Sequence, residues 1–283
     1  MSSMLSGNTE MTTIFKDAAD LHAAMEANYF AYFKCFSQLP YMELQVNPEI
    51  TCLISSTLHH WNTVLRTQIT TSDVVAKVKA TLAYFDALNL PLMWHILPST
   101  RPSDLGHYLE ASGLKLVLEE PHMAVDLSKL SLKPPVLPDL VIECVHDKTS
   151  FDRWYQATAA GFFATSPVRA QIYFDAYTML GFNPEGPLLH YVGYLHGEPV
   201  TSSTLLLAEG IAGIYDVSTV PAARGQRLGT AITQATLLEA RMRGYSHACL
   251  QATQQGYNVY RRLDFEEQFM QRDYLWHANF ATI

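Results

Sequence analysis

The loop with the clearest chemical signal lies at residues 219–230, between a β-rich segment and a helix-like run. It reads Thr-Val-Pro-Ala-Ala-Arg-Gly-Gln-Arg-Leu-Gly-Thr, so Gly225 and Gly229 lie on either side of the expected helix start at Leu228. The first N–H groups of a helix are unpaired and carry the positive end of the helix dipole, which suits a pyrophosphate. The loop alone is a weak signal, because a glycine before a helix is often ordinary turn chemistry. It fits neither a Walker loop nor a dinucleotide fingerprint.

A second segment that could do chemistry follows one expected strand later, at residues 250–265. It reads Leu-Gln-Ala-Thr-Gln-Gln-Gly-Tyr-Asn-Val-Tyr-Arg-Arg-Leu-Asp-Phe and places Tyr260 on a short amphipathic helix. A tyrosine in this position could donate a proton to a leaving group, or it could simply fill the core. The residues alone leave both interpretations open.

Together, the two segments resemble the GNAT superfamily of N-acetyltransferases, over most of residues 139–277. The family's pyrophosphate loop has Arg or Gln, two residues, Gly, one residue and then Gly or Ala, and residues 224–229 are similar to it. The second segment resembles the family signature that ends in Val-Tyr-Arg-Arg-Leu-Gly-Phe. The resemblance implies direct acetyl transfer from acetyl-CoA, in a ternary complex, to a primary amine of a small molecule or peptide. The alternative is a non-catalytic acyl-CoA sensor or interaction module.

The resemblance also implies roles for individual residues. Val217 would offer the backbone N–H that polarises the thioester carbonyl, and Tyr260 would be the acid for the departing thiolate. The pyrophosphate would bind the N–H groups of residues 226–230. The residues expected to bind acetyl-CoA are Ser218, Thr219, Val220, Arg224, Gly225, Gln226, Arg227, Leu228, Gly229, Thr230, Thr253 and Tyr260.

The sequence departs from the family pattern where Arg227 and Asp264 replace glycines. If the loop glycine serves a left-handed backbone conformation, Arg227 costs about 1 kcal/mol of strain. If it only makes room for phosphates, the guanidinium must point away or pair with them, and a charge-assisted contact would offset the lost fit.

The general base is not evident from the strand at 213–220. Strict alternation would put Tyr215 and Val217 on one face and Asp216 and Ser218 on the other. Asp216 would then face away from the site in a structural role. We therefore expect water-relayed deprotonation assisted by Tyr215, with Glu209 at the neighbouring turn as a reserve candidate.

The elements that position these residues form an α/β, or α+β, pattern. The fold class expected is a tandem GNAT-like fold, with a mixed, mostly antiparallel central sheet flanked by helices in each half. In the first half we expect helices at 15–36, 72–88 and 102–112, and strands at 43–46, 51–55, 92–97, 114–118 and 122–127. In the second half we expect helices at 151–161, 169–180, 228–243 and 257–263, and strands at 140–145, 188–195, 199–207, 213–220, 247–252, 265–270 and 274–277.

The predicted domains are a flexible N-terminus at 1–14, a degenerate GNAT-like domain at 15–130, a proline-rich linker at 131–138 and an acetyl-CoA-binding domain at 139–283. The turn before the helix of the first half, at 69–73, lacks glycine and carries Asp73, which would repel a pyrophosphate. The first half is therefore expected to shape the acceptor cleft or the domain packing, and to bind no CoA.

The composition of the chain limits the classes of partner that we expect. Among 283 residues the net charge is −8 and no basic run occurs, so a nucleic-acid partner is not expected. No apolar stretch is long enough for a membrane span, and neither the four scattered cysteines nor the pair His59 and His60 has metal-ligand spacing. We expect a cytoplasmic protein with reduced thiols and no metal. The oligomeric state, monomer or homodimer, is left open.

Overall fold

The structure is a computed structural model that describes residues 15–55, 62–70, 72–130 and 137–276. The predicted N-terminal segment 1–14 and most of the predicted linker lie outside these residues. The described elements, in chain order, are α1 (Ala18–Phe36), β1 (Met42–Val46), β2 (Ile50–Ser55), β3 (Thr63–Thr67), α2 (Val74–Ala87), β4 (Leu92–Ile96), α3 (Leu105–Ala111), β5 (Lys115–Asp126), β6 (Leu140–Cys144), α4 (Lys148–Phe162), α5 (Pro167–Leu180), β7 (Leu188–Leu195), β8 (Glu198–Ala208), β9 (Ile211–Thr219), the 3-10 turn η2 (Pro221–Ala223), α6 (Leu228–Met242), β10 (His247–Gln251), α7 (Tyr257–Arg261) and β11 (Glu266–Trp276).

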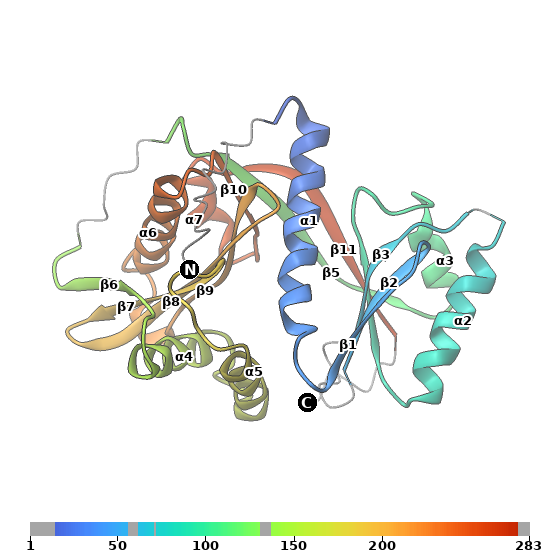
Figure 1. Cartoon of the computed structure of the whole chain (residues 1–283), viewed down its shortest axis with the longest axis horizontal. Coiled ribbons are helices and arrows are strands. Elements are labelled where there is room, and N and C mark those ends of the chain that lie inside the picture. The colour runs from blue at the N-terminus through green and yellow to red at the C-terminus, as the bar shows by residue number, and fades with distance from the viewer. Residues whose placement is uncertain (1–14, 56–61, 71, 131–136, 277–283) are drawn as a thin grey trace, which may run out of the picture.

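Within the described residues, a single sheet of eleven strands runs through both halves, in the order β1-β2-β3-β4-β11-β5-β10-β9-β8-β7-β6 (Figure 1). Its neighbours are antiparallel except at β3–β4 and β9–β10, so the predicted mixed and mostly antiparallel sheet is confirmed. The order β3-α2-β4-α3-β5 of the first half repeats as β9-α6-β10-α7-β11 in the second. The two halves are therefore built on one plan.

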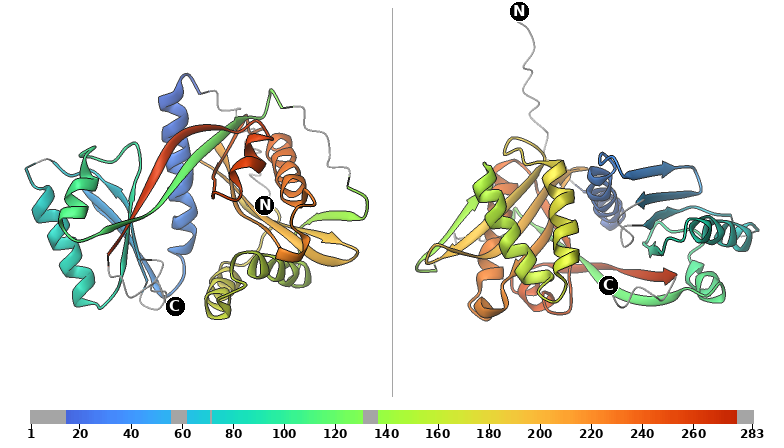
Figure 2. Two further views of the ribbon diagram at one scale, coloured as in Figure 1. Left: turned by 180° about the vertical axis from the view of Figure 1, so that it is seen from behind. Right: turned by 90° about the horizontal axis from the view of Figure 1, so that it is seen from below.

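The two long strands β5 and β11 cross from one half into the other (Figures 1 and 2). Residues 122–126 of β5 pair with β10, whereas residues 272–276 of β11 pair with β4. Each half thus completes its sheet with a strand from the other. The division at 131–138 stays a prediction, and the exchange means that a cut there would remove a strand from both sheets.

Each of these strands was predicted as two short ones, and the structure corrects this. β5 continues through Glu119 to Pro121, where charged residues and a proline are typical of a turn. Proline is tolerated in a strand that lacks a neighbour on one side, and Pro121 lies where pairing with β10 begins. β11 likewise continues through 271–273, where its polar side chains hydrogen-bond to side chains of the neighbouring strands β5 and β4.

Helix α1 of the first half lies between the two halves and is held to the second by a buried amide (Figure 2). Asn28 donates to the carbonyls of Ala208 and Ile211, at 2.9 Å each, and accepts from the Tyr215 hydroxyl at 2.8 Å. A Cβ atom at Gly213 would lie 2.0 Å from the Asn28 oxygen. Glycine at 213 is therefore what lets α1 approach β9.

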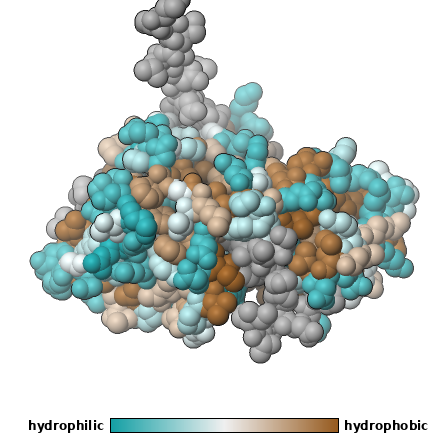
Figure 3. Space-filling view, turned by 60° about the horizontal axis from the view of Figure 1, so that its bottom comes forward, coloured by the Kyte–Doolittle hydropathy of each residue, from teal (hydrophilic) through white to brown (hydrophobic). Residues whose placement is uncertain are grey.

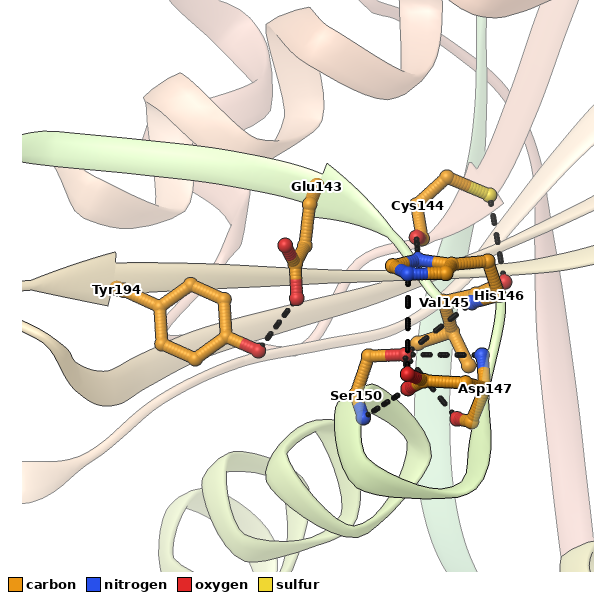
Figure 4. Close-up of polar contacts among 7 residues, drawn as sticks. All are labelled: Glu143, Cys144, Val145, His146, Asp147, Ser150 and Tyr194. Atoms are coloured by element: carbon orange, nitrogen blue, oxygen red, sulfur yellow. Dashed lines mark hydrogen bonds and ion pairs between the residues drawn. The ribbon is translucent and has the colours of Figure 1, made fainter.

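Helix α4 begins at a capping box, drawn in Figure 4. Asp147 accepts from the Ser150 N–H at 2.7 Å, and the Ser150 hydroxyl accepts from the Asp147 N–H at 3.2 Å. The neighbouring His146 bonds through Nδ1 to the carbonyl of Cys144, and its ring makes no bond to Ser150. These residues therefore fix a helix end, and they lack the serine–imidazole contact of a hydrolytic triad.

Polar and apolar side chains are interspersed on the face drawn in Figure 3, with larger apolar patches over the N-terminal half at the right. In that half, three consecutive residues of β5 are exposed: Leu116, Val117 and Leu118. They lie opposite an irregularity in the pairing of β5 with β11, between Asp273 and Tyr274. Such bulges are a common protection of a free sheet edge.

Candidate active site

A large cavity lies where β9 and β10 separate. These two parallel strands pair only through Ala212–Gly213 and Ala248–Cys249, so beyond these residues they diverge. The gap opens into a cavity of about 700 Å³. Its lining residues are Gly161, Phe162, Val217, Ser218, Thr219, Ala223, Arg224, Gly225, Arg227, Leu228, Gly229, Thr230, Thr253, Gln254, Gln255, Gly256, Val259, Tyr260 and Arg262. The structure thus brings the two sequence segments together around one space.

The loop before α6 turns through two left-handed residues. Gly225 has φ 80°, and Arg227, the N-cap of α6, has φ 62° and ψ 17°. The first of the two interpretations of this position is therefore correct, because the backbone adopts the conformation that favours glycine. The N-cap side chain makes no capping bond, which leaves the first N–H groups of α6 facing the cavity rim without a side-chain partner.

Three arginines surround this loop. Arg224 donates to the carbonyls of Thr219 (3.2 Å) and Gly161 (3.1 Å), so it ties the loop to the end of α4. Arg227 and Arg262 line the cavity, and their side chains make no hydrogen bond or ion pair within the described part of the chain. Two unpaired cations beside a helix N-terminus form a site suited to phosphate groups. The sequence did not lead us to predict Arg262 as a site residue. The only signal for it was its position as the second arginine of the Val-Tyr-Arg-Arg-Leu segment.

Strand β9 carries a bulge that overturns the predicted alternation. Thr204 of β8 pairs with Tyr215 and Ser202 with Ser218, so two residues of β9 oppose one of β8. Asp216 sits in this bulge with φ 53°. The bulge puts Tyr215, Asp216 and Ser218 on the face covered by α1, α4 and α5, while Val217 packs against the opposite core. The prediction that Asp216 faces away from Tyr215 is therefore wrong.

Asp216 is half-buried in a group of tyrosines between α1 and α5. Its carboxylate accepts from the hydroxyls of Tyr177 at 2.8 Å and Tyr32 at 3.3 Å, and these hydroxyls lie 2.8 Å apart. Burial raises the pKa of Asp216, and the tyrosine hydrogen bonds lower it in part. The hydroxyl of Tyr173, in contact with Tyr177, is buried without a hydrogen-bond partner among the described residues.

The structure argues against the two groups that were expected to assist deprotonation. The Tyr215 hydroxyl is bonded to Asn28, its ring stacks on Tyr32 at 4.0 Å, and burial raises its pKa well above the usual value. It does not line the cavity. Glu209 lies in the turn before β9, at the opposite end of this strand from Val217. Neither group is placed to receive a proton in the cavity.

Tyr260 projects from α7 into the cavity lining and packs on Phe265 with ring centroids 5.8 Å apart. Burial, with a smaller contribution from the Glu120 carboxylate, raises the pKa of Tyr260, so the phenol stays protonated at neutral pH. The hydroxyl makes no hydrogen bond to another described residue. Of the predicted site residues, all line the cavity except Tyr215, Val220 and Gln226.

The corresponding turn of the first half differs. Asp73 is the N-cap of α2 and makes no capping bond, while its carboxylate accepts from the Thr70 hydroxyl. A carboxylate at a helix N-terminus occupies the place where an anion would bind. Among the described residues no group of His, Cys, Asp or Glu is arranged to hold a metal, and no helix has the length and hydropathy of a membrane span. His59 and His60 lie outside the described residues.

Several solved structures share this fold across both halves. A GCN5-related N-acetyltransferase from Kribbella flavida is 17% identical with a TM-score of 0.71, covering 91% of this chain and 97% of that one. One from Sphaerobacter thermophilus is 15% identical, with a TM-score of 0.63 and 94% coverage of each chain. A tandem GNAT protein from the clavulanic acid biosynthesis pathway is 11% identical, with a TM-score of 0.61 and coverage of 94% and 96%. No family model and no curated protein matched the sequence.

Proposed function

We propose that this chain, which has the tandem GNAT fold, is an N-acetyltransferase that transfers an acetyl group from acetyl-CoA to a primary amine. One observation carries the proposal: the cavity between β9 and β10 joins the glycine-bearing loop, the β9 bulge and Tyr260. Fold alone does not specify function, whereas this set of groups matches the needs of acyl transfer.

The loop end of the cavity would hold the pyrophosphate of acetyl-CoA. The N–H groups of residues 226–230 and the positive end of α6 favour an anion there. Arg227 and Arg262 have no other partner among the described residues, so both are available to phosphates. The first half has Asp73 at the equivalent place and would bind no CoA.

The bulge end would hold the thioester. A residue added by a bulge is left out of the strand ladder, which frees an N–H near Val217 to stabilise the oxyanion. The amine attacks the carbonyl carbon, and the C–S bond breaks as the C–N bond forms. Tyr260 would give its proton to the departing thiolate and recover one from the amide nitrogen.

Thiol release from acetyl-CoA tests this proposal. The full-length protein would be assayed with putrescine, glucosamine, phenethylamine and a peptide with a free N-terminus, alongside calorimetric titration with CoA. Amine-dependent release that saturates in both substrates supports the transferase. CoA binding without release for any amine would favour the alternative, a non-catalytic acyl-CoA sensor or interaction module.

The remaining assignments are proposals of the same kind. The acceptor would be a small molecule or a peptide, with neither nucleic acid nor membrane as a partner, and the protein would act in the cytoplasm. All four cysteines are free in the structure, and burial raises the pKa of the Cys52 and Cys249 thiols to about 12. Such thiols are unreactive, which is compatible with a reducing compartment.

A further inference from the structure

We infer that two copies of this chain associate through the free edge of β5, residues 115–119, which pairs with the same segment of the other copy in antiparallel register around Val117. The sheets of the two copies would then join across a two-fold axis. The oligomeric state, which the sequence left open, would be a dimer. Such a dimer does not depend on acetyl transfer, so its absence would leave the proposed function untouched.

The edge of β5 is free in the N-terminal half. β5 pairs with β10 only from residue 122 onward, and the bond nearest to the edge segment is the one that the Ala252 N–H donates to the Pro121 carbonyl, at 3.0 Å. Residues 115–119 pair with β11 on their other side alone (Figure 2). Their outward N–H and C=O groups therefore have no strand partner among the described residues. Such a row of groups is a template for another strand.

The side chains along this edge are apolar and exposed. Leu116, Val117 and Leu118 follow one another in the sequence and are 41%, 48% and 42% exposed. The two outermost strands of the described sheet differ, because β1 and β6 each expose one large apolar side chain, Val46 and Val141. Three consecutive apolar side chains at an unpaired edge are typical of a surface that another chain covers.

The charges at the ends of the segment indicate a second copy as the partner. The segment reads Lys-Leu-Val-Leu-Glu, so antiparallel pairing around Val117 places Lys115 of each copy opposite Glu119 of the other. Leu116 then lies opposite Leu118, and Val117 lies opposite Val117 of the other copy. Opposite-charge pairs across two strands stabilise a sheet, and the two-fold axis forms this charge pair twice.

Both charged side chains are available for this pairing. Lys115 is exposed, and its ammonium makes no hydrogen bond or ion pair within the described part of the chain. Glu119 accepts from Arg272 at 2.9 Å, and its side chain is still 49% exposed. In the dimer the Glu119 carboxylate would lie between Arg272 and the Lys115 ammonium of the other copy, so it would have two cations beside it.

The bulge in β5 restricts which strands can pair with this edge. Val117 has no opposite residue on β11, because Leu116 pairs with Tyr274 and Leu118 with Asp273. A bulge increases the local twist, which disfavours a flat strand as partner, whereas a second copy has the same twist. The segment is short compared with a permanent interface, so we expect a reversible dimer.

The test is sedimentation velocity of the full-length protein over a concentration series. The wild type should show a monomer–dimer equilibrium. Lys115→Glu and Glu119→Lys each place like charges opposite one another, and each should weaken dimerisation by about 5- to 100-fold. An equimolar mixture of these two variants should associate again, because the mixed dimer has opposite charges at both pairs. Val117→Lys places two cations at the two-fold axis and should abolish the dimer.

Val141→Lys is the matched control. It puts the same charge on an exposed valine of β6, another edge strand, and should leave the association unchanged. Circular dichroism checks that each variant is folded. A monomer at every concentration would overturn the inference and leave this edge to an extended segment of another protein. A dimer that survives Val117→Lys, or a mixture of the two charge variants that associates no more tightly than either alone, would overturn it as well.

Discussion

Variants at Arg227 can distinguish two effects of this residue: the strain of its left-handed backbone and the attraction of its charge for a phosphate. Arg227 is exposed, left-handed at φ 62°, and without a side-chain partner among the described residues. A left-handed non-glycine residue costs roughly 1 kcal/mol. This strain exists before any ligand binds, so it lowers folding stability and cancels in the binding equilibrium. Loss of a charge-assisted phosphate contact costs roughly 1–3 kcal/mol of affinity.

Two variants should therefore give different results in two assays. Arg227→Gly and Arg227→Ala should both weaken CoA binding by about 5- to 150-fold, the equivalent of the lost contact. Arg227→Gly should be more stable to unfolding than Arg227→Ala by roughly 1 kcal/mol, because glycine relieves the left-handed strain. Arg227→Lys, which keeps the charge, is the control and should retain part of the affinity.

Calorimetric CoA titration at two salt concentrations and urea unfolding measure these effects. The difference in affinity between wild type and Arg227→Ala should shrink at high salt, because salt screens an exposed charge contact. CoA binding by Arg227→Gly that is as tight as wild type, or tighter, would refute the reasoning. Equal free energies of unfolding for the Gly and Ala variants would refute the inference that the backbone at residue 227 is strained.

Three further predictions concern Gly161, Tyr260 and the buried His122. Gly161→Ala should lower the free energy of unfolding by about 1–3 kcal/mol in urea melts, since its Cβ would lie 2.6 Å from that of Ser218. Gly229→Ala, which has no such clash, should not. Tyr260→Phe should lower turnover about 10- to 1000-fold at unchanged CoA affinity by calorimetry, and unchanged turnover where chemistry limits the rate would remove it from the mechanism. Burial lowers the pKa of His122 to about 4. The unfolded chain therefore takes up a proton between pH 6.5 and 4 that the folded chain does not. Stability should fall across this window by up to about 3 kcal/mol, and His122→Gln should flatten the fall.

Local sequence signals predicted the part of the site that depends on short-range geometry. The glycine-bearing loop and the start of α6 at Leu228 follow from turn and capping chemistry, and the structure has them where they were expected. Tyr260 lies in the cavity lining because a short helix after β10 returns it to the loop. The loop and the short helix each form from residues that are close to one another in the sequence.

The features that were missed depend on distant parts of the chain. The β9 bulge at Asp216 reverses the strand alternation, and only its pairing with β8 reveals it. The hydrogen-bond partners of Asp216 come from α1 and α5. Asn28 hydrogen-bonds to Tyr215 of β9, which is more than 180 residues away in the sequence. The exchange of β5 and β11 could not be predicted from local sequence either, because each strand pairs with neighbours from both halves of the chain.

The position of bound acetyl-CoA is the most direct measurement of the central claim. A crystal structure of the full-length protein with acetyl-CoA should place the pyrophosphate within hydrogen-bonding distance of the N–H groups of residues 226–230. The thioester should lie between β9 and β10, with its oxygen toward Val217 and its sulfur toward Tyr260. A cosubstrate bound elsewhere, or a pyrophosphate at the α2 turn of the N-terminal half, would contradict the account.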